Sequence, residues 1–307
     1  PDAPLGAPVH LKTGDYPGLI EAAREAFVRL RAEPLSLIAC GAGPALGRRL
    51  KLSNAAWDID GAATAEALRL DDGLLLNDFE AQALSLPALH DDWTMRIGPV
   101  TKGVAGGPRV ILGPGTGLGI GALIESGGKH IPVSSEACHA DFGPVDDEEA
   151  AIWRAFERVH GRITTEAVMS GPGLARLHAA RLAVAGAPPE GLDSAGVVAA
   201  ANADAASRAA DTARLFWRIV ARFSGDMAIT FVATGGVTLS GGMLPRLKAF
   251  VDPATFRAAF EDKAPIDFVK RTPTRMVVHD DSVLHGMAAI AARPEIYAID
   301  YAGRGWR

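Results

Sequence analysis

The chain has 307 residues, of which 48% are apolar and 22% charged, and its formal net charge is −5. This length and composition suit a globular protein with one large domain or two smaller ones, and they supply ample apolar material for a core. They exclude two classes of protein, those that span a membrane and those that bind nucleic acid. No apolar stretch reaches the roughly 18 residues of a membrane span. The sequence also has no run of like charges of the kind that marks a nucleic-acid surface.

The cysteines and the start of the chain indicate where the protein works. Cys40 lies in an apolar run and Cys138 in a polar turn, far apart in the sequence. A chain of this size needs no disulfide scaffold, and reduced thiols suit a cytoplasmic protein. Residues 1–11 carry no recognisable signal peptide. We therefore expect a cytoplasmic protein that binds neither membrane nor nucleic acid.

Strand and helix signals alternate along the chain, which favours an α/β fold. In the first part they predict a helix over 19–30 after Asp15 and Pro17, a buried strand over 35–40, a helix capped by Asp60, a buried strand over 74–76 and a helix over 79–86.

The second part begins with a predicted hairpin, whose strands at 109–112 and 120–124 flank the glycine-rich segment 113–119. Asp146 is expected to cap a helix that has Ile152, Phe156 and Val159 on one face and ends at Gly161. The later elements are at least two helices within 193–233, a short polar turn between two glycine pairs at 235–236 and 241–242, a strand over 275–279, a final helix over 282–292 and an extended tail over 293–307.

Asp78 follows a buried strand and precedes a helix. A carboxylate at such a junction lies at the crevice edge where α/β sheets bind ligands. The alternative is structural, because Asp78 could cap the helix over 79–86, and Asn77 fits that boundary equally well. The local pattern leaves both interpretations open.

The segment 113–119 has four glycines around Thr116. Glycines let backbone N–H groups approach phosphate oxygens closely, and the threonine hydroxyl adds a donor. The segment is not a Walker loop, and Leu118 breaks the dinucleotide fingerprint. A plain hairpin turn is the alternative, but it requires fewer glycines, so the pattern favours a phosphate site.

Three further segments carry weaker signals. Glu136 and His139 can enter one pocket and hydrogen-bond sugar hydroxyls. A metal site with Cys138, His139 and His130 is their rival, but the sequence lacks the paired Cys or His motifs that zinc sites use, and we predict no metal site. Glu166 alone indicates only a helix-start acid. The glycine pairs at 235–236 and 241–242 permit close approach to a flat ligand such as adenine.

Taken in order, these segments resemble the bacterial glucokinases of the hexokinase and actin-like ATPase superfamily. The resemblance extends from about Tyr16 to Ala288. Its matching segments are 76–81, 113–119, 136–142, 170–173, 235–245, 256–263 and 278–280.

The resemblance implies a two-lobed, actin-like (ribonuclease H-like) α/β fold with a ligand cleft. The small domain would comprise 1–88 plus 281–307, and the large domain 89–280. Asp78 would be the catalytic base, with Asn77, Glu136, His139 and Glu166 as further sugar contacts. Phosphate contacts would come from Gly113, Gly115, Thr116 and Gly117, and adenosine contacts from Gly235, Gly236, Gly241 and Gly242. The family also implies ATP with Mg²⁺, bound mainly through the phosphates, and a homodimer.

The chain departs from the family pattern in two places. The family's opening Asp-x-Gly-Gly-Thr-Asn phosphate hairpin has no counterpart, and we attribute this to truncation or disorder before Pro1. The usual Glu-Gly-Gly-His is replaced by Glu136-Ala137-Cys138-His139, so side chains stand at two glycine positions. A positive φ at either position would be strained.

These observations predict ATP-dependent phosphorylation of glucose at its 6-hydroxyl, with Asp78 as general base. One alternative is a kinase for another hexose, for which the repressor, open-reading-frame and kinase (ROK) group is the natural home. That group's cysteine-rich zinc segment is missing, however. The other alternative is a non-catalytic sugar-binding regulator, although no DNA-reading helix-turn-helix is recognisable in the chain.

Overall fold

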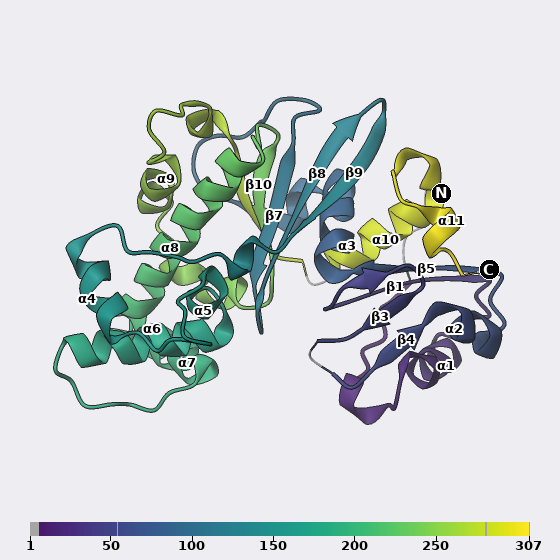
Figure 1. Ribbon diagram of the computed structural model, residues 1–307, viewed down its shortest axis with the longest axis horizontal. Helices are drawn as coiled ribbons and strands as arrows, with labels where there is room; N and C mark the ends of the chain where they lie inside the picture. Colours follow the sequence, from purple (N-terminus) through teal and green to yellow (C-terminus); the bar gives the residue numbers. More distant parts are fainter. Residues whose placement is uncertain (1–5, 54, 280, 307) are drawn as a thin grey trace. The chain divides into compact units, whose positions relative to one another are not determined.

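The computed structural model describes residues 6–53, 55–279 and 281–306 (Figure 1). Pro1 and Asp280, which entered the sequence analysis, lie outside these ranges. The chain divides into two compact units, one of residues 1–89, 125–132 and 281–307 and one of 90–124 and 133–280. The division expected from the sequence did not anticipate that 125–132 belongs with the first unit.

The described residues of the first unit form two small sheets. Its strands are β1 (Ser36–Gly41), β2 (Ala45–Leu46), β3 (Arg49–Lys51), β4 (Asp58–Asp60) and β5 (Asp72–Asn77). Its helices are α1 (Leu19–Leu30), α2 (Gly61–Leu68), α3 (Asp78–Ser85), α10 (Ser282–Ala292) and α11 (Tyr301–Arg304), with 3₁₀ turns at Thr13–Asp15, Leu86–Ala88 and Pro294–Ile296. β1 and β5 pair in parallel and place Gly41 beside Asn77, while β2, β3 and β4 form an antiparallel sheet.

The predicted elements of this unit are confirmed to within a residue or two. Asp60 caps α2, as expected, because its side chain accepts a hydrogen bond from Ala63 N at 3.1 Å. The first helix begins at Leu19, and its N-cap is Gly18 rather than Asp15.

The prediction of an extended C-terminal tail was wrong. The tail contains α11, and Trp306 beyond it is 1% exposed. Its backbone N–H donates to Gly73 O at 3.0 Å. The indole fits because Gly61 and Gly73 lack side chains, and a Cβ at either position would collide with the ring. The tail therefore completes the core of this unit, and α10 is not the final helix.

The second unit is built around a six-stranded sheet of the described residues, ordered β6-β11-β10-β7-β8-β9. The strands are β6 (Thr94–Arg96), β7 (Arg109–Pro114), β8 (Leu118–Ser126), β9 (Lys129–Ser135), β10 (Gly236–Leu239) and β11 (Thr274–Val277). β7, β10 and β11 run parallel, whereas β6 and β8 run antiparallel to their neighbours.

Helices cover one face of this sheet and extend beyond it. They are α4 (Asp147–Ala155), α5 (Thr165–Val168), α6 (Gly171–Val184), α7 (Ser194–Ala203), α8 (Arg208–Thr230) and α9 (Pro253–Glu261), with 3₁₀ turns at Asp91–Trp93, Ala137–His139, Leu244–Phe250 and Phe268–Arg271. The long helix α8 contacts β7 and β10, and α6 and α7 pack against it (Figure 1). Val110, Leu112, Val237 and Leu239 face this side and belong to the core.

Three predicted elements of the second unit need correction. Asp146 caps α4 as expected, accepting from Glu149 N at 2.8 Å, but the helix ends at Ala155. Phe156 leaves the helix and stacks on Trp153 in the core, with ring centroids 5.9 Å apart. Val159 lies in a tight turn beyond it, which the positive φ of Gly161 permits.

The second correction concerns the segment between the two glycine pairs. It is not a polar turn but β10, whose four residues are all buried. Val237 and Leu239 alternate towards the core, although four residues are too few for that pattern to stand out in the sequence. The strand after it ends at Val277 rather than at His279.

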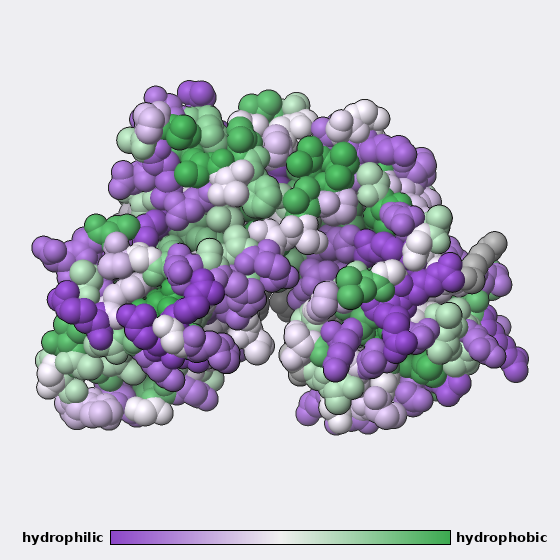
Figure 2. Space-filling model, viewed as in Figure 1, coloured by the Kyte–Doolittle hydropathy of each residue, from purple (hydrophilic) through white to green (hydrophobic). Residues whose placement is uncertain are grey.

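None of the helices in the described part of the chain is long and apolar enough to cross a bilayer. Figure 2 shows hydrophilic side chains spread over the visible face of both units, with hydrophobic side chains in small separate groups. Single exposed apolar residues are normal on a folded protein.

Candidate active site

Asp78 is the first residue of α3, at the carboxyl end of β5. The cap of this helix is Asn77, whose Oδ1 accepts from Phe79 N at 2.9 Å and from Glu80 N at 3.2 Å. The Glu80 carboxylate accepts from Asn77 N at 3.3 Å, which completes a capping box. The interpretation of Asp78 as the cap is therefore wrong, although Asp78 Oδ1 also accepts a hydrogen bond from Phe79 N at 3.0 Å, and its carboxylate is half-buried.

A residue of the C-terminal tail supports this junction. Arg304 donates to both oxygens of Glu80, at 2.7 and 2.8 Å, and to Leu75 O at 2.8 Å. The hydrogen bond to Glu80 is the main cause of the raised pKa of Arg304. The two side chains are only 18% and 9% exposed. Sequence analysis missed this contact, because 224 residues separate the partners and the tail shows no motif.

Asn77 also ties the junction to the neighbouring strand. Its Nδ2 donates to Gly43 O at 2.9 Å. Gly43 has a φ of 144°, and a Cβ there would collide with Lys51 O, so the loop after β1 depends on glycine. The carboxyl ends of β1 and β5 thus form one edge, as expected for a ligand crevice. Asn77 Oδ1 and one Nδ2 hydrogen already make hydrogen bonds within the protein, which leaves the second Nδ2 hydrogen for a ligand.

In the second unit, the glycine-rich segment forms the tip of the β7–β8 hairpin. The predicted loop over 113–119 is shorter than expected, since Gly113 pairs with Gly119 and the turn consists of residues 115–117. A Cβ on Gly113 would collide with Ser240 O, and one on Gly117 would press on the Glu166 carboxylate. Both glycines therefore allow close approach, and Thr116 at the tip is exposed.

Glu166 links this hairpin to a helix. It lies in the first turn of α5, as predicted, behind the cap Thr164, whose hydroxyl accepts from Ala167 N at 3.2 Å. Its Oε2 accepts from Leu118 N at 3.0 Å. The carboxylate is thus held against the hairpin, and its second oxygen has no partner among the described residues.

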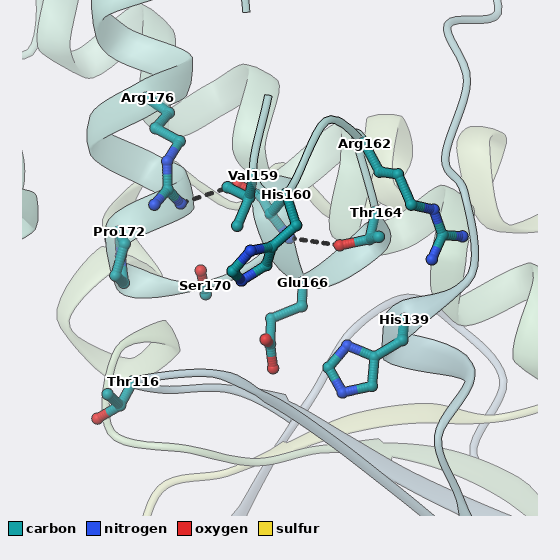
Figure 3. Close-up of a pocket in the computed structure, with 11 residues that line it drawn as sticks. Thr116, His139, Val159, His160, Arg162, Thr164, Glu166, Ser170, Pro172 and Arg176 are labelled. Carbon is teal, nitrogen blue, oxygen red and sulfur yellow. Dashed lines mark hydrogen bonds between the residues drawn. The ribbon is translucent and has the colours of Figure 1, made fainter. Parts of the chain in front are cut away.

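Glu166, His139 and Thr116 line one cavity of about 320 Å³ within the second unit (Figure 3). The Glu166 carboxylate extends between the other two side chains in this view. Three basic side chains also line it, namely those of His160, Arg162 and Arg176. Sequence reasoning missed these three because they come from a turn and a neighbouring helix with no motif. The cavity brings together a carboxylate that can accept from sugar hydroxyls, a threonine hydroxyl and two arginines, which are ion-paired with Asp141 and Glu157.

The turn that carries Glu136 and His139 is a single 3₁₀ turn, Ala137–His139. Glu136 Oε2 lies 3.6 Å from His139 Nε2, and the two side chains are 87% and 58% exposed. Neither Ala137 nor Cys138 has a positive φ, so the strain considered for side chains at the family's glycine positions does not arise. The Cys138 side chain points inward instead and is 4% exposed, contrary to the expected polar setting.

Glu136, Cys138 and His139 also form a possible metal cluster, because their ligand atoms lie within 4.8 Å of one another. His130, considered with them in the sequence analysis, is not part of the group. Burial, reinforced by the charges of Glu166 and Glu136, raises the pKa of the Cys138 thiol to about 12. Metals bind the thiolate, so this thiol is a poor ligand at neutral pH.

The two glycine pairs expected to contact adenosine are separated by the strand between them. Gly241 lies beside the hairpin, where a Cβ would press on Pro114 O, and Gly242 next to it is open. Gly236 pairs with Arg109 at the opposite end of β10, and Gly235 precedes it. Four strand residues span about 13 Å. The structure therefore brings Gly241 and Gly242 to the glycine hairpin, but not Gly235 and Gly236.

The chain was compared with known proteins. The glucokinase family model matches residues 5–294. A glucokinase of Sinorhizobium medicae is 38% identical over 302 residues, which are 97% of this chain and 88% of the relative. A crystal structure of glucokinase from an Antarctic psychrotroph has 26% identity and a TM-score of 0.82, and covers 92% of this chain and 88% of its own.

A second solved structure is more distant. Glucokinase from Balamuthia mandrillaris, in complex with glucose, has 20% identity and a TM-score of 0.71 over 89% of this chain and 81% of its own, which indicates a shared fold. The family match and the curated relative confirm the resemblance inferred from the ordered motifs. The chain belongs to the glucokinase family and has its two-lobed actin-like fold.

Proposed function

We propose that this chain is a glucokinase, which transfers the γ-phosphoryl group of ATP to the 6-hydroxyl of glucose. Family membership over nearly the whole chain supports the reaction and both substrates. The observation that carries the catalytic assignment is the position of Asp78 at the carboxyl end of β5, next to the helix cap that Asn77 supplies.

Phosphoryl transfer needs little covalent chemistry from the protein, so positioning and charge neutralisation dominate. Asp78 accepts the proton of the sugar 6-hydroxyl as this oxygen attacks the γ-phosphorus in line. Glu166 accepts a hydrogen bond from a sugar hydroxyl through the oxygen that Leu118 does not use. His139, Glu136 and the remaining Nδ2 hydrogen of Asn77 add further hydroxyl contacts.

The phosphates of ATP are assigned to the hairpin tip, with the Thr116 hydroxyl and the glycines at 113–117 around it, and adenosine to Gly241 and Gly242. Mg²⁺ accompanies ATP and neutralises its phosphates. It keeps several waters and needs few protein ligands, so a hairpin without carboxylates fits this mode of binding. We also infer from the family a cytoplasmic homodimer.

The test is the Asp78→Ala variant, with Asp78→Asn to keep the side-chain size. We expect kcat to fall by about 10²–10⁴, the usual contribution of a general base, with glucose affinity less affected. A coupled assay with Mg-ATP measures turnover, and calorimetry measures glucose binding. Asp92→Asn, at an exposed position in the second unit, controls for the change of charge. Near-normal turnover of Asp78→Ala would remove this residue from the role.

The same assay run across hexoses tests the substrate. Preference for another hexose would indicate a related sugar kinase. Sugar binding by the intact chain without phosphoryl transfer to any hexose would indicate a regulator, and would contradict the proposed function.

A further inference from the structure

A second cavity, of about 160 Å³, lies in the second unit where β7, β10 and β11 begin. Its lining includes Arg96, Arg109 and Arg275, and one carboxylate, that of Asp91. Thr238 and the pair Gly235-Gly236 also line it. The glycine hairpin and Gly241 lie at the other end of the same strands. The catalytic proposal therefore assigns no role to this cavity.

Strand register places the three arginines on one face of the sheet. Arg275 pairs with Arg96 on β6 and with Thr238 on β10. Thr238 pairs with Ile111 on β7, and Arg109 lies two residues before Ile111. Paired residues share a face, as do residues two apart in a strand. The opposite face is the apolar one that packs under α8.

This arrangement places like charges together. Arg96 and Arg275 are direct cross-strand partners, and like charges in that relation are destabilising. Arg96 is compensated by an ion pair with Asp91 at 2.9 Å. Arg275 makes no ion pair with any described carboxylate, and its Nε donates to Thr238 Oγ1 at 3.2 Å.

The electrostatic environment of Arg275 agrees with this picture. Burial lowers the pKa of its guanidinium, and the charge of Arg109 lowers it further, while Asp91 acts in the opposite direction. Arginine nevertheless keeps its charge in proteins. An anion between Arg275 and Arg109 would therefore offset the repulsion between the two guanidinium groups and compensate the partly buried charge of Arg275.

The size of the cavity limits the anion. About 160 Å³ is well below the roughly 300–1,000 Å³ of pockets that hold drug-sized ligands, so a nucleotide does not fit. Guanidinium groups match tetrahedral phosphate oxygens with paired N–H donors. We propose that this cavity is a binding site for a phosphate-type oxyanion, separate from the site of the ATP phosphates.

The test uses the full chain and inorganic phosphate as the probe. Phosphate is titrated by calorimetry in chloride buffer of constant ionic strength, with saturating Mg-ADP present to occupy the nucleotide site. We expect saturable binding with a dissociation constant of about 1 mM or lower. Arg275→Gln and Arg109→Gln should each weaken binding by at least about tenfold, because each removes charge-assisted hydrogen bonds.

Arg154→Gln is the matched control, since it makes the same charge change at an exposed position on α4 and should leave phosphate affinity unchanged. Circular dichroism checks that each variant is folded. If Arg275→Gln does not fold, Arg109→Gln still tests the proposal. Methyl phosphate, titrated in parallel, identifies the source of the anion. Tighter binding than phosphate indicates a phosphate ester, and equal or weaker binding indicates free phosphate. The proposal is overturned if phosphate does not bind with Mg-ADP present, or binds equally to wild type and both variants.

Discussion

The junction around Asp78 and the turn around Glu136 carry predicted sugar contacts, but the chain holds them in different ways. At the junction, the Asn77 amide, the Glu80 carboxylate and the Arg304 guanidinium bond one another or nearby backbone. At the turn, the Glu136 side chain is 87% exposed, and the neighbouring His139 side chain, 3.6 Å away, is 58% exposed.

This difference determines what each region can contribute. Side chains locked by packing and hydrogen bonds are preorganised, so the strand–helix junction that carries Asp78 needs little ordering when substrate binds. An exposed Glu136 must lose rotamer freedom on binding, which offsets part of any hydrogen bond it makes. We therefore expect changes at the junction to lower kcat and stability, and changes near the turn to raise KM.

The largest effect after Asp78 itself should come from Arg304→Gln. Removal of this guanidinium leaves Glu80 buried with an uncompensated charge, and breaking a buried pair in this way costs about 3–5 kcal/mol. Urea denaturation measures the free energy of unfolding. Glu80 also accepts from Asn77 N in the capping box beside Asp78, so loss of Arg304 should disturb the position of the catalytic base. We therefore expect kcat to fall while KM for glucose changes little.

Two variants calibrate this result. Arg29→Gln removes an exposed ion pair with Glu25 on α1 of the same unit, and should cost at most about 0.5 kcal/mol. Arg304→Lys keeps the charge but loses the two-pronged contact, and should fall between wild type and Arg304→Gln. If Arg304→Gln lowers the free energy of unfolding no more than Arg29→Gln does, the stability of the junction does not depend on the tail.

A smaller effect should separate Glu166 from Glu136. Glu166→Gln can still accept from Leu118 N, so the hairpin contact survives while the charge is lost. We expect KM for glucose to rise by about tenfold or more, the value of a charge-assisted hydrogen bond. Glu136→Gln should raise KM less, because that side chain is not held in place. Steady-state kinetics across hexoses measures both, and an unchanged KM for every hexose in both variants would place the sugar site elsewhere.

Local patterns were sufficient for part of the fold and site. The strand–helix boundary at Asn77 and Asp78, the cap at Asp60 and the glycine hairpin each follow from a few adjacent residues. The order of the motifs along the chain then gave the family. These features are local or ordered in sequence, so no spatial information was needed to find them.

The misjudged features depend on contacts distant in sequence. Arg304 and Trp306 acquire their roles from Glu80, Gly61 and Gly73, and nothing in the tail alone indicates those partners. The two glycine pairs around β10 look alike in sequence, and only strand pairing shows that they lie at opposite ends. The arginine cavity is of the same kind, since its three members come from three separate strands.

The smallest predicted effect uses the two thiols as reporters of the compared regions. Burial raises the pKa of both Cys40 and Cys138 from an ordinary value of 9.0 to about 12, with Asp78 adding to the shift at Cys40, and Glu166 and Glu136 at Cys138. Both thiols therefore stay protonated in the folded chain while the unfolded chain ionises near pH 9. Stability contributed below that pH is lost as pH rises from about 9 towards 12.

At pH 8 a thiol reagent should therefore modify the native chain much more slowly than the urea-unfolded chain, because the thiolate is the reactive form. Glu166→Gln should lower the pKa of Cys138 and speed its modification without affecting Cys40, whereas Asp78→Asn should do the reverse. Mass spectrometry of the modified peptides separates the two rates. If either variant speeds the modification of both cysteines equally, the cause is a general loosening of the fold rather than the loss of one neighbouring charge. That result would contradict the prediction that each cysteine senses only the carboxylates of its own region.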